Sequence, residues 1–176
     1  MTLALRARPD ASEFPPFYAG YIAAVPDGDI IAVLREGESE IADALEAIPE
    51  SKASHRYAEG KWTVCTLIGH MIDAERIFSY RALRLARGDS TPLPGFDEND
   101  FARTAGSDTR LVSDLASELS IVRAGTVRLF DSLPEDAWAR RGIVSGGEVS
   151  VRALAYITAG HAKHHLKVLR ERYLAS

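Results

Sequence analysis

The repeated spacing of apolar residues constrains this chain more than any other feature of its sequence. In four segments, apolar residues recur three and four positions apart, the pattern of a helix that buries one face. These segments are residues 28–47, 64–87, 109–132 and 150–174. Four long helices with little strand between them predict an all-α protein, specifically a four-helix bundle. The 176 residues fit one domain, which we expect to span residues 1–176.

Start and stop signals accompany each predicted helix. A side-chain oxygen just before a helix accepts a hydrogen bond from a free amide of the first turn. The predicted capping residues are Asp27 or Asp29, Thr63, Asp108 and Ser150. Gly88 is expected to end the second helix in a left-handed conformation, and Pro49 stops the first.

The predicted connections differ in length. Residues 1–27 contain four prolines and predict an irregular N-terminal arm. Residues 89–107 predict a long loop between the second and third helices, with a short turn at 98–102, which could cross the bundle or cover a pocket. One extra turn at 134–138 and either a small hairpin or a loop at 142–149 precede the fourth helix. The arm's aromatic residues could lie on the core or on a partner subunit: Phe14, Phe17, Tyr18 and Tyr21.

The charge distribution argues against a nucleic-acid-binding protein. The net charge is -4, and no cluster of lysine and arginine supplies a basic face. The richest stretch, Arg76 to Arg87, is interpreted as a solvated helix face with one functional arginine. We therefore expect no nucleic-acid partner.

Cysteine content and hydropathy indicate a cytoplasmic protein. The one cysteine, Cys65, cannot form an internal disulfide, which fits a reducing compartment, and its apolar surroundings predict plain packing. No apolar run approaches the roughly 20 residues that a membrane span requires. The N-terminus also lacks the apolar segment of a signal peptide.

Three histidines carry the chemistry that the sequence predicts. His161 and His165 are four residues apart, one helical turn, on the same stripe as apolar residues that should face the bundle interior. Buried imidazoles need partners, and a divalent ion would satisfy both rings. His70, at the margin of the second helix's apolar stripe, could face them across the core. Three histidine ligands leave coordination positions open, as catalytic sites do.

Other polar residues could surround these histidines. His164 is expected beside them as part of the pocket wall, and Trp62 precedes the second helix. Asp73 or Glu75 could orient a ligand histidine, although an ion pair with Arg76 or Arg81 is an equally good interpretation. Glu75 falls within an apolar stripe, so its carboxylate must be paired. His55 lies in a polar segment and is predicted to be at the surface.

Three segments resemble the DinB-like superfamily, which includes YfiT-type proteins. They are Gly60-Lys61-Trp62-Thr63, His70-Met71-Ile72-Asp73-Ala74-Glu75-Arg76 and Gly160-His161-Ala162-Lys163-His164-His165-Leu166. The resemblance covers roughly residues 30–174. It implies a four-helix bundle, commonly dimeric, with a nickel or zinc ion on His70, His161 and His165. It also implies that the family name concerns expression after DNA damage, not DNA binding.

The resemblance leaves the reaction open. Family members with known chemistry add a low-molecular-weight thiol to an electrophile, or rearrange a substrate with a thiol's help. We therefore expect a metal-dependent enzyme that acts on a small molecule, either a thiol S-transferase or a hydrolase. A non-catalytic, stress-linked, metal-binding dimer is the alternative. In a third interpretation the bundle binds partners and its histidines are incidental. Histidine ligands alone do not distinguish zinc, nickel, copper and iron.

Overall fold

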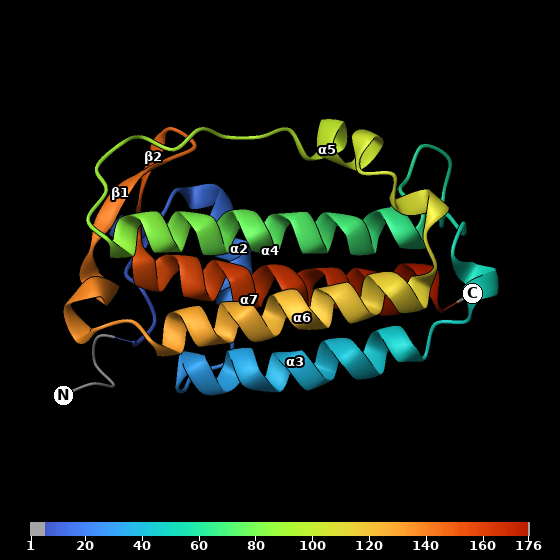
Figure 1. Ribbon diagram of the computed structural model, residues 1–176, viewed down its shortest axis with the longest axis horizontal. Helices are drawn as coiled ribbons and strands as arrows, with labels where there is room; N and C mark the ends of the chain where they lie inside the picture. Colours follow the sequence, from blue (N-terminus) through green and yellow to red (C-terminus); the bar gives the residue numbers. More distant parts are fainter. Residues whose placement is uncertain (1–5, 176) are drawn as a thin grey trace.

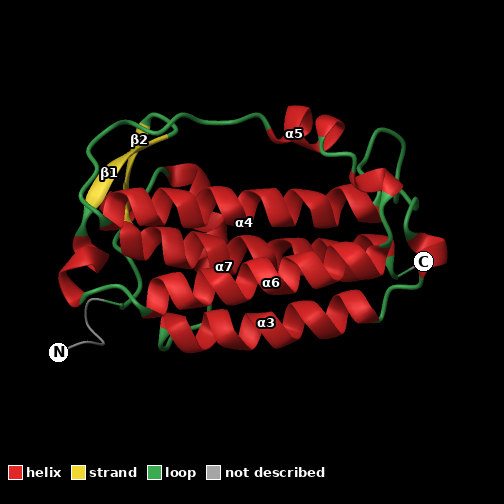
Figure 2. Ribbon diagram, in the orientation of Figure 1, coloured by secondary structure: helices red, strands yellow, loops and turns green. Residues whose placement is uncertain are grey.

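The computed structural model describes residues 6–175, and its main body is a bundle of four long helices (Figure 1). They are α3 (Ile30–Glu46), α4 (Val64–Ala86), α6 (Val112–Asp131) and α7 (Val151–Val168). One π-helical turn, Leu169–Tyr173, continues α7. Apart from helices, the described residues form one small two-stranded sheet (Figure 2). The predicted all-α bundle is confirmed. No helix within 6–175 combines the length and apolar character needed to cross a bilayer.

The direction of the helices explains the long connection. α4 and α6 pack side by side and run the same way, whereas α7 runs opposite to α4 (Figure 1). The chain leaving α4 must therefore travel back along the bundle before α6 can begin. Residues 87–111 make this crossing and carry the short helix α5 (Glu98–Thr104), where the sequence predicts only a turn.

The hairpin holds this connection at one end of the bundle. β1 (Arg141–Val144) and β2 (Gly147–Ser150) pair antiparallel, so the hairpin is the correct one of the two predicted alternatives. Leu93 of the connection donates its amide to the Ile143 carbonyl and accepts from the Ser145 amide, both at 2.9 Å. The loop 89–97 is thereby fixed against the hairpin over the end of α4.

Most of the predicted helix ends are correct. The side chains of Asp29, Thr63 and Ser150 accept from the first-turn amides of α3, α4 and α7. Gly88 follows α4 with φ of +77°, the left-handed conformation that glycine tolerates best. These signals are local, which is why the sequence alone reveals them.

The predicted start of the third helix is wrong. α6 begins at Val112, and Asp108 does not cap it. The carboxylate of Glu50, distant in sequence, accepts instead from the amides of Val112 and Ser113 at 2.9 and 3.0 Å. Asp108 lies in a preceding 3-10 turn and accepts from the hydroxyl of Thr66 at 2.7 Å.

The N-terminal arm is more ordered than predicted. Its described part, from residue 6, contains 3-10 turns at Ala11–Glu13 and Pro16–Tyr18 and the short helix α2 (Ala19–Ala23); residues 1–5 of the predicted arm lie outside the described residues. α2 packs on α7. A Cβ at Gly160 would lie 1.9 Å from the carbonyl oxygen of Tyr21, so this close approach requires glycine.

The apolar core forms two clusters along the bundle. One surrounds the hairpin end and includes Phe78 and Ile157, and the other fills the opposite end and includes Met71 and Leu166. On α7, the boundary between the clusters falls at His161. His161 therefore lies near the middle of the core.

Candidate metal centre

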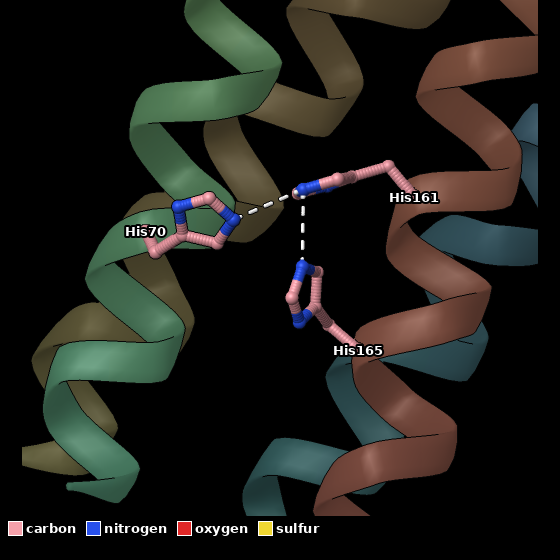
Figure 3. Close-up of side chains that lie close together, drawn as sticks. All are labelled: His70, His161 and His165. Atoms are coloured by element: carbon pink, nitrogen blue, oxygen red, sulfur yellow. Dashed lines mark hydrogen bonds between the residues drawn. The ribbon is translucent and has the colours of Figure 1, made fainter. Parts of the chain in front are cut away.

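Three buried histidines converge in the middle of the bundle. His70 projects from α4, and His161 and His165 project from successive turns of α7 (Figure 3). The Nε2 atom of His161 lies 3.0 Å from Nε2 of His70 and 3.1 Å from Nε2 of His165. Among the described residues, these three form a cluster whose ligand atoms all lie within 4.8 Å of one another.

The interior keeps these imidazoles neutral. Burial lowers the pKa of His70 to about 4, with a smaller opposing effect from the Glu98 carboxylate. Burial, followed by the charges of His70 and His164, lowers the pKa of His165 to about 3. Burial also holds the pKa of His161 well below its ordinary range. Neutral imidazole is the form that coordinates a metal.

Hydrogen bonds alone do not satisfy this arrangement. Each Nε2 contact needs one N–H and one lone pair, and His161 Nε2 takes part in two contacts. A divalent ion would accept a lone pair from each ring. Zinc–nitrogen bonds of about 2.0–2.1 Å place tetrahedral ligands roughly 3.3 Å apart, close to the two distances observed. The donor set therefore fits a divalent ion.

A cavity of about 390 Å³ opens onto the three histidines. Its walls are largely aromatic, and Arg81, Glu98 and Ser145 add polar groups. Pockets of this size accommodate small organic molecules. The aromatic lining residues are Phe17, Tyr18, Tyr21, Trp62, Phe78 and Phe96.

Residues 34–169 match the DinB superfamily over well more than half of the chain. The chain belongs to the DinB superfamily. A protein of Geobacillus kaustophilus named "Putative metal-dependent hydrolase" is 26% identical to this DinB chain over 137 residues, 77% of each protein. The predicted family is therefore confirmed, and so is the predicted similarity to proteins named as metal-dependent.

Solved structures share the DinB fold. YfiT from Bacillus subtilis, described as "a probable metal-dependent hydrolase with an unusual four-helix bundle topology", superposes with a TM-score of 0.76, 17% identity and 97% coverage of each chain. A mycothiol-dependent maleylpyruvate isomerase gives 0.67 at 18% identity, covering 78% of this chain and 58% of that one. The colibactin self-resistance protein ClbS, solved with double-stranded DNA, gives 0.57 at 20% identity, covering 81% and 94%. These likenesses show the fold alone.

Two of the other candidate site residues lie beside the DinB histidines. The ring centroid of Trp62 is 4.8 Å from that of His70. His164 is exposed, with its ring centroid 4.9 Å from that of His165 and 5.5 Å from that of Tyr21. A second cavity, of about 290 Å³, is lined by Trp62, His164 and His165 among others. Trp62 and His165 thus line both cavities.

The acidic candidates do not contact the histidines. Glu75 is buried and accepts from Arg123 of α6 in a bidentate pair, with both distances 2.7 Å. The expectation that it must be paired holds, but the partner is neither Arg76 nor Arg81. Asp73 lines a separate small cavity, where burial raises its pKa and Arg76 partly opposes that effect.

Two further predictions concern residues outside the cluster. Cys65 is buried, as expected for plain packing, and burial raises the pKa of its thiol. The surface prediction for His55 is wrong, because this residue is half-buried with its ring centroid 6.2 Å from that of Tyr173. Its Nε2 is buried and has no hydrogen-bond partner within the described chain.

Sequence reasoning missed two charged residues of the main cavity. Glu98 belongs to α5, and its loop position carries no periodic signal. Burial, followed by the charge of Glu98, raises the pKa of Tyr21 on the same cavity. Arg81 is buried three positions after Phe78, so its inward position on α4 could have been read from helical spacing.

Proposed function

We propose that this DinB chain binds a divalent transition metal ion through His70, His161 and His165 and uses it to join a small thiol to an electrophile. The main support for this proposal is that three neutral imidazoles converge on the wall of an aromatic cavity. Three imidazoles suit zinc, nickel, copper and iron, of which we favour nickel or zinc from the family resemblance. A bound ion would supply positive charge that favours deprotonation of a thiol or of water.

The two cavities support a reaction between two substrates. The main cavity has mostly aromatic walls, whereas the second adds Lys61 and Asn99 to aromatic and aliphatic side chains. Both reach His165. We assign the second cavity, with its Lys61 and Asn99, to the thiol's polar body and the main aromatic cavity to the electrophile. A cavity of this size and a net charge of -4 favour small molecules over nucleic acid.

Glu98 is the side chain that we assign to proton transfer. Its carboxylate lines the cavity and acts electrostatically on His70 and Tyr21. It would accept the proton that the thiol loses as the carbon–sulfur bond forms. We expect Glu98→Gln to lower the turnover rate by about 100-fold with unchanged metal content, as measured by steady-state kinetics and elemental analysis. Unchanged turnover would exclude this role.

Hydrolysis is the second candidate. It is supported by the name of the Geobacillus kaustophilus relative, and in this reaction the electrophile would react with water. The same three histidines and the same cavity would serve it, and the second cavity would have no required occupant. We also propose, from the family resemblance, that the chain forms a homodimer, which sedimentation equilibrium would test.

Metal content is the first test. We expect protein purified without an affinity tag to contain about one transition-metal ion per chain by elemental analysis, because three ligands converge at one point. His161→Ala should lose that ion. His164→Ala is the matched control, since this neighbouring histidine is exposed and lies outside the cluster. Absence of metal from the parent after incubation with zinc and nickel would contradict the proposal.

A thiol-transfer assay tests the reaction. Metal-loaded protein is mixed with 1-chloro-2,4-dinitrobenzene and, in turn, cysteine, glutathione or coenzyme A. Transfer forms a carbon–sulfur bond and releases chloride and a proton, and the aryl thioether is measured by absorbance. Turnover with a thiol that His161→Ala abolishes would support the transferase. Metal binding without turnover, together with hydrolysis of ester or amide probes, would support the hydrolase instead. If the metal-loaded protein shows neither thiol transfer nor hydrolysis, that result would favour a non-catalytic metal-binding protein.

A further inference from the structure

The described chain contains two buried arginines with opposite surroundings. Arg123 is 1% exposed and is paired with the carboxylate of Glu75. Arg81 is 3% exposed, yet no carboxylate within residues 6–175 forms an ion pair with it. A buried charge without a counter-charge is costly, so such groups are usually paired. Arg81 therefore lacks the partner that Arg123 has.

The neutral contacts of Arg81 leave part of its guanidinium available. Its Nη2 donates to the Pro94 carbonyl at 2.8 Å and to the Ser145 hydroxyl at 3.0 Å. Burial lowers the pKa of Arg81, and the Tyr18 hydroxyl opposes that effect, but guanidinium stays protonated in proteins. A guanidinium has five N–H donors, and these three partners do not use them all.

Arg81 lies on the main cavity, away from the histidines. Arg81 and His70 are three turns apart on α4, about 16 Å along the helix axis, and both line the same cavity. Glu98 acts on His70 at the histidine end. The Glu98 carboxylate therefore acts at the histidine end of the cavity, and the Arg81 guanidinium lies at the other end. Arg81 is the one arginine or lysine among the described residues that line it.

We infer that Arg81 binds a carboxylate of the substrate that occupies the aromatic cavity. This inference rests on the proposed function, because it assumes that the cavity holds the electrophile. A single guanidinium matches one carboxylate in charge and bidentate geometry, whereas a doubly charged phosphate would call for a second cation. The substrate class is an aromatic or unsaturated carboxylic acid whose reacting atom lies at the end of the molecule opposite its carboxylate.

A purely structural role for Arg81 is the competing explanation. Its bonds to Pro94 and Ser145 hold the 89–97 loop and the hairpin against α4. Loss of that contact would loosen the cavity wall for every ligand. A carboxylate-binding role has a narrower consequence, since it affects only ligands that carry the charge. The two roles are separated by comparing ligands of the same shape and different charge.

The test uses 4-phenylbutanoate and 4-phenylbutanamide with the full chain. Binding of each to the parent, Arg81→Gln and Arg81→Lys is measured by isothermal titration calorimetry. Arg81→Gln removes the charge and keeps a polar amide, whereas Arg81→Lys keeps the charge. Arg84→Gln is the control, because Arg84 lies one turn further along α4, pairs with Asp89 and does not line the cavity. Circular dichroism and melting temperature verify the fold of each variant.

We expect the parent and Arg84→Gln to bind the carboxylate roughly 10-fold more tightly than the amide, as a hydrogen bond to a charged group implies. Arg81→Gln should bind both equally, and Arg81→Lys should recover part of the preference. Equal binding of the two ligands by the parent would overturn the inference. A preference for the carboxylate that persists in Arg81→Gln would also overturn it. An equal fall in affinity for the carboxylate and the amide in Arg81→Gln would do the same.

His161→Ala separates this inference from the proposed function. We expect this variant to keep its preference for the carboxylate while it loses metal and turnover. A parent without metal or turnover that still prefers the carboxylate through Arg81 would refute the proposed function and leave the anion site standing. A metal-loaded, active parent without the preference would refute only the anion site.

Discussion

Buried ionisable side chains in three settings determine what the interior of this bundle can do. The histidines are neutral and face one another, Glu75 and Arg123 neutralise each other, and Arg81 remains without a carboxylate. All three follow from the cost of removing a charge from water. A buried group is neutral, is paired with an opposite charge, or is available to a charged ligand. Structural and functional polar residues are thereby distinguished by their partners and not by their burial.

The ion pair of Glu75 and Arg123 supports a stability prediction at this scale. Glu75→Gln leaves the Arg123 guanidinium buried without a counter-charge, so we expect a loss of about 3–5 kcal/mol in unfolding free energy. Urea denaturation followed by circular dichroism measures it. Asp131→Asn is the control, because its ion pair with Arg35 is exposed and should contribute at most about 1 kcal/mol. A loss in Glu75→Gln no larger than in the control would contradict this reasoning.

The sequence predicted part of this residue-scale arrangement. The spacing of His161 and His165 indicated a shared inward stripe, and the position of Glu75 indicated a necessary partner. Arg123 could not be named as that partner, because it comes from a helix packed against α4 and not from the same helix. Glu98 was missed for a related reason, since its place on the cavity depends on the path of the whole connection to α6.

At the scale of elements, close packing of α2 on α7 shapes the cavity. α2 and the turn before it carry Tyr18 and Tyr21 into the wall, and this packing depends on a glycine adjacent to His161. Local sequence signals correctly predicted the starts of α3, α4 and α7, which Asp29, Thr63 and Ser150 cap. The start of α6 and the order in the N-terminal arm were missed, because tertiary contacts such as Glu50 with Val112 determine them.

Gly160→Ala tests the role of this packing. The new methyl group would meet the Tyr21 carbonyl oxygen at 1.9 Å, so α2 must move away from α7. We expect a loss of about 1–3 kcal/mol in unfolding free energy, together with weaker binding of 4-phenylbutanoate. Gly125→Ala on α6 is the matched control, because nothing lies within 4 Å of its added Cβ. That variant should gain about 0.5–1 kcal/mol in stability, and equal effects of the two substitutions would exclude the packing role.

At the scale of the molecule, segments outside the four helices complete the cavity, and two of them contribute most. The connection to α6 supplies Phe96 and Glu98 from one side, and the N-terminal arm supplies Phe17 and Tyr18 from another. The bundle could be predicted from hydrophobic periodicity, but the cavity could not, because both covering segments lack that periodicity. Substrate binding should therefore depend on contacts that fix these segments to the bundle.

One such contact joins the arm to the start of α7 and predicts a dependence of stability on pH. The carboxylate of Glu13 is buried and accepts from Arg152 Nε at 2.7 Å and also from Nη2. Burial alone would raise the pKa of Glu13, but hydrogen bonds from Arg152, Ser150 and the Asp10 amide outweigh it and lower the pKa to about 2 from an ordinary 4.5. The folded state therefore binds the proton more weakly than the unfolded state.

The stabilisation is present above pH 4.5 and is lost as the pH falls through 4.5 toward 2. A shift of this size corresponds to about 3 kcal/mol. We expect Glu13→Gln to be less stable than the parent by about this amount near pH 7, with the difference shrinking toward zero as the pH approaches 2. Urea denaturation of both proteins across this range measures the difference. Asp27→Asn, which breaks the exposed ion pair with Arg8, should change stability far less. A difference between Glu13→Gln and the parent that stays constant with pH would show that lost packing, and not the charge of Glu13, holds the arm in place.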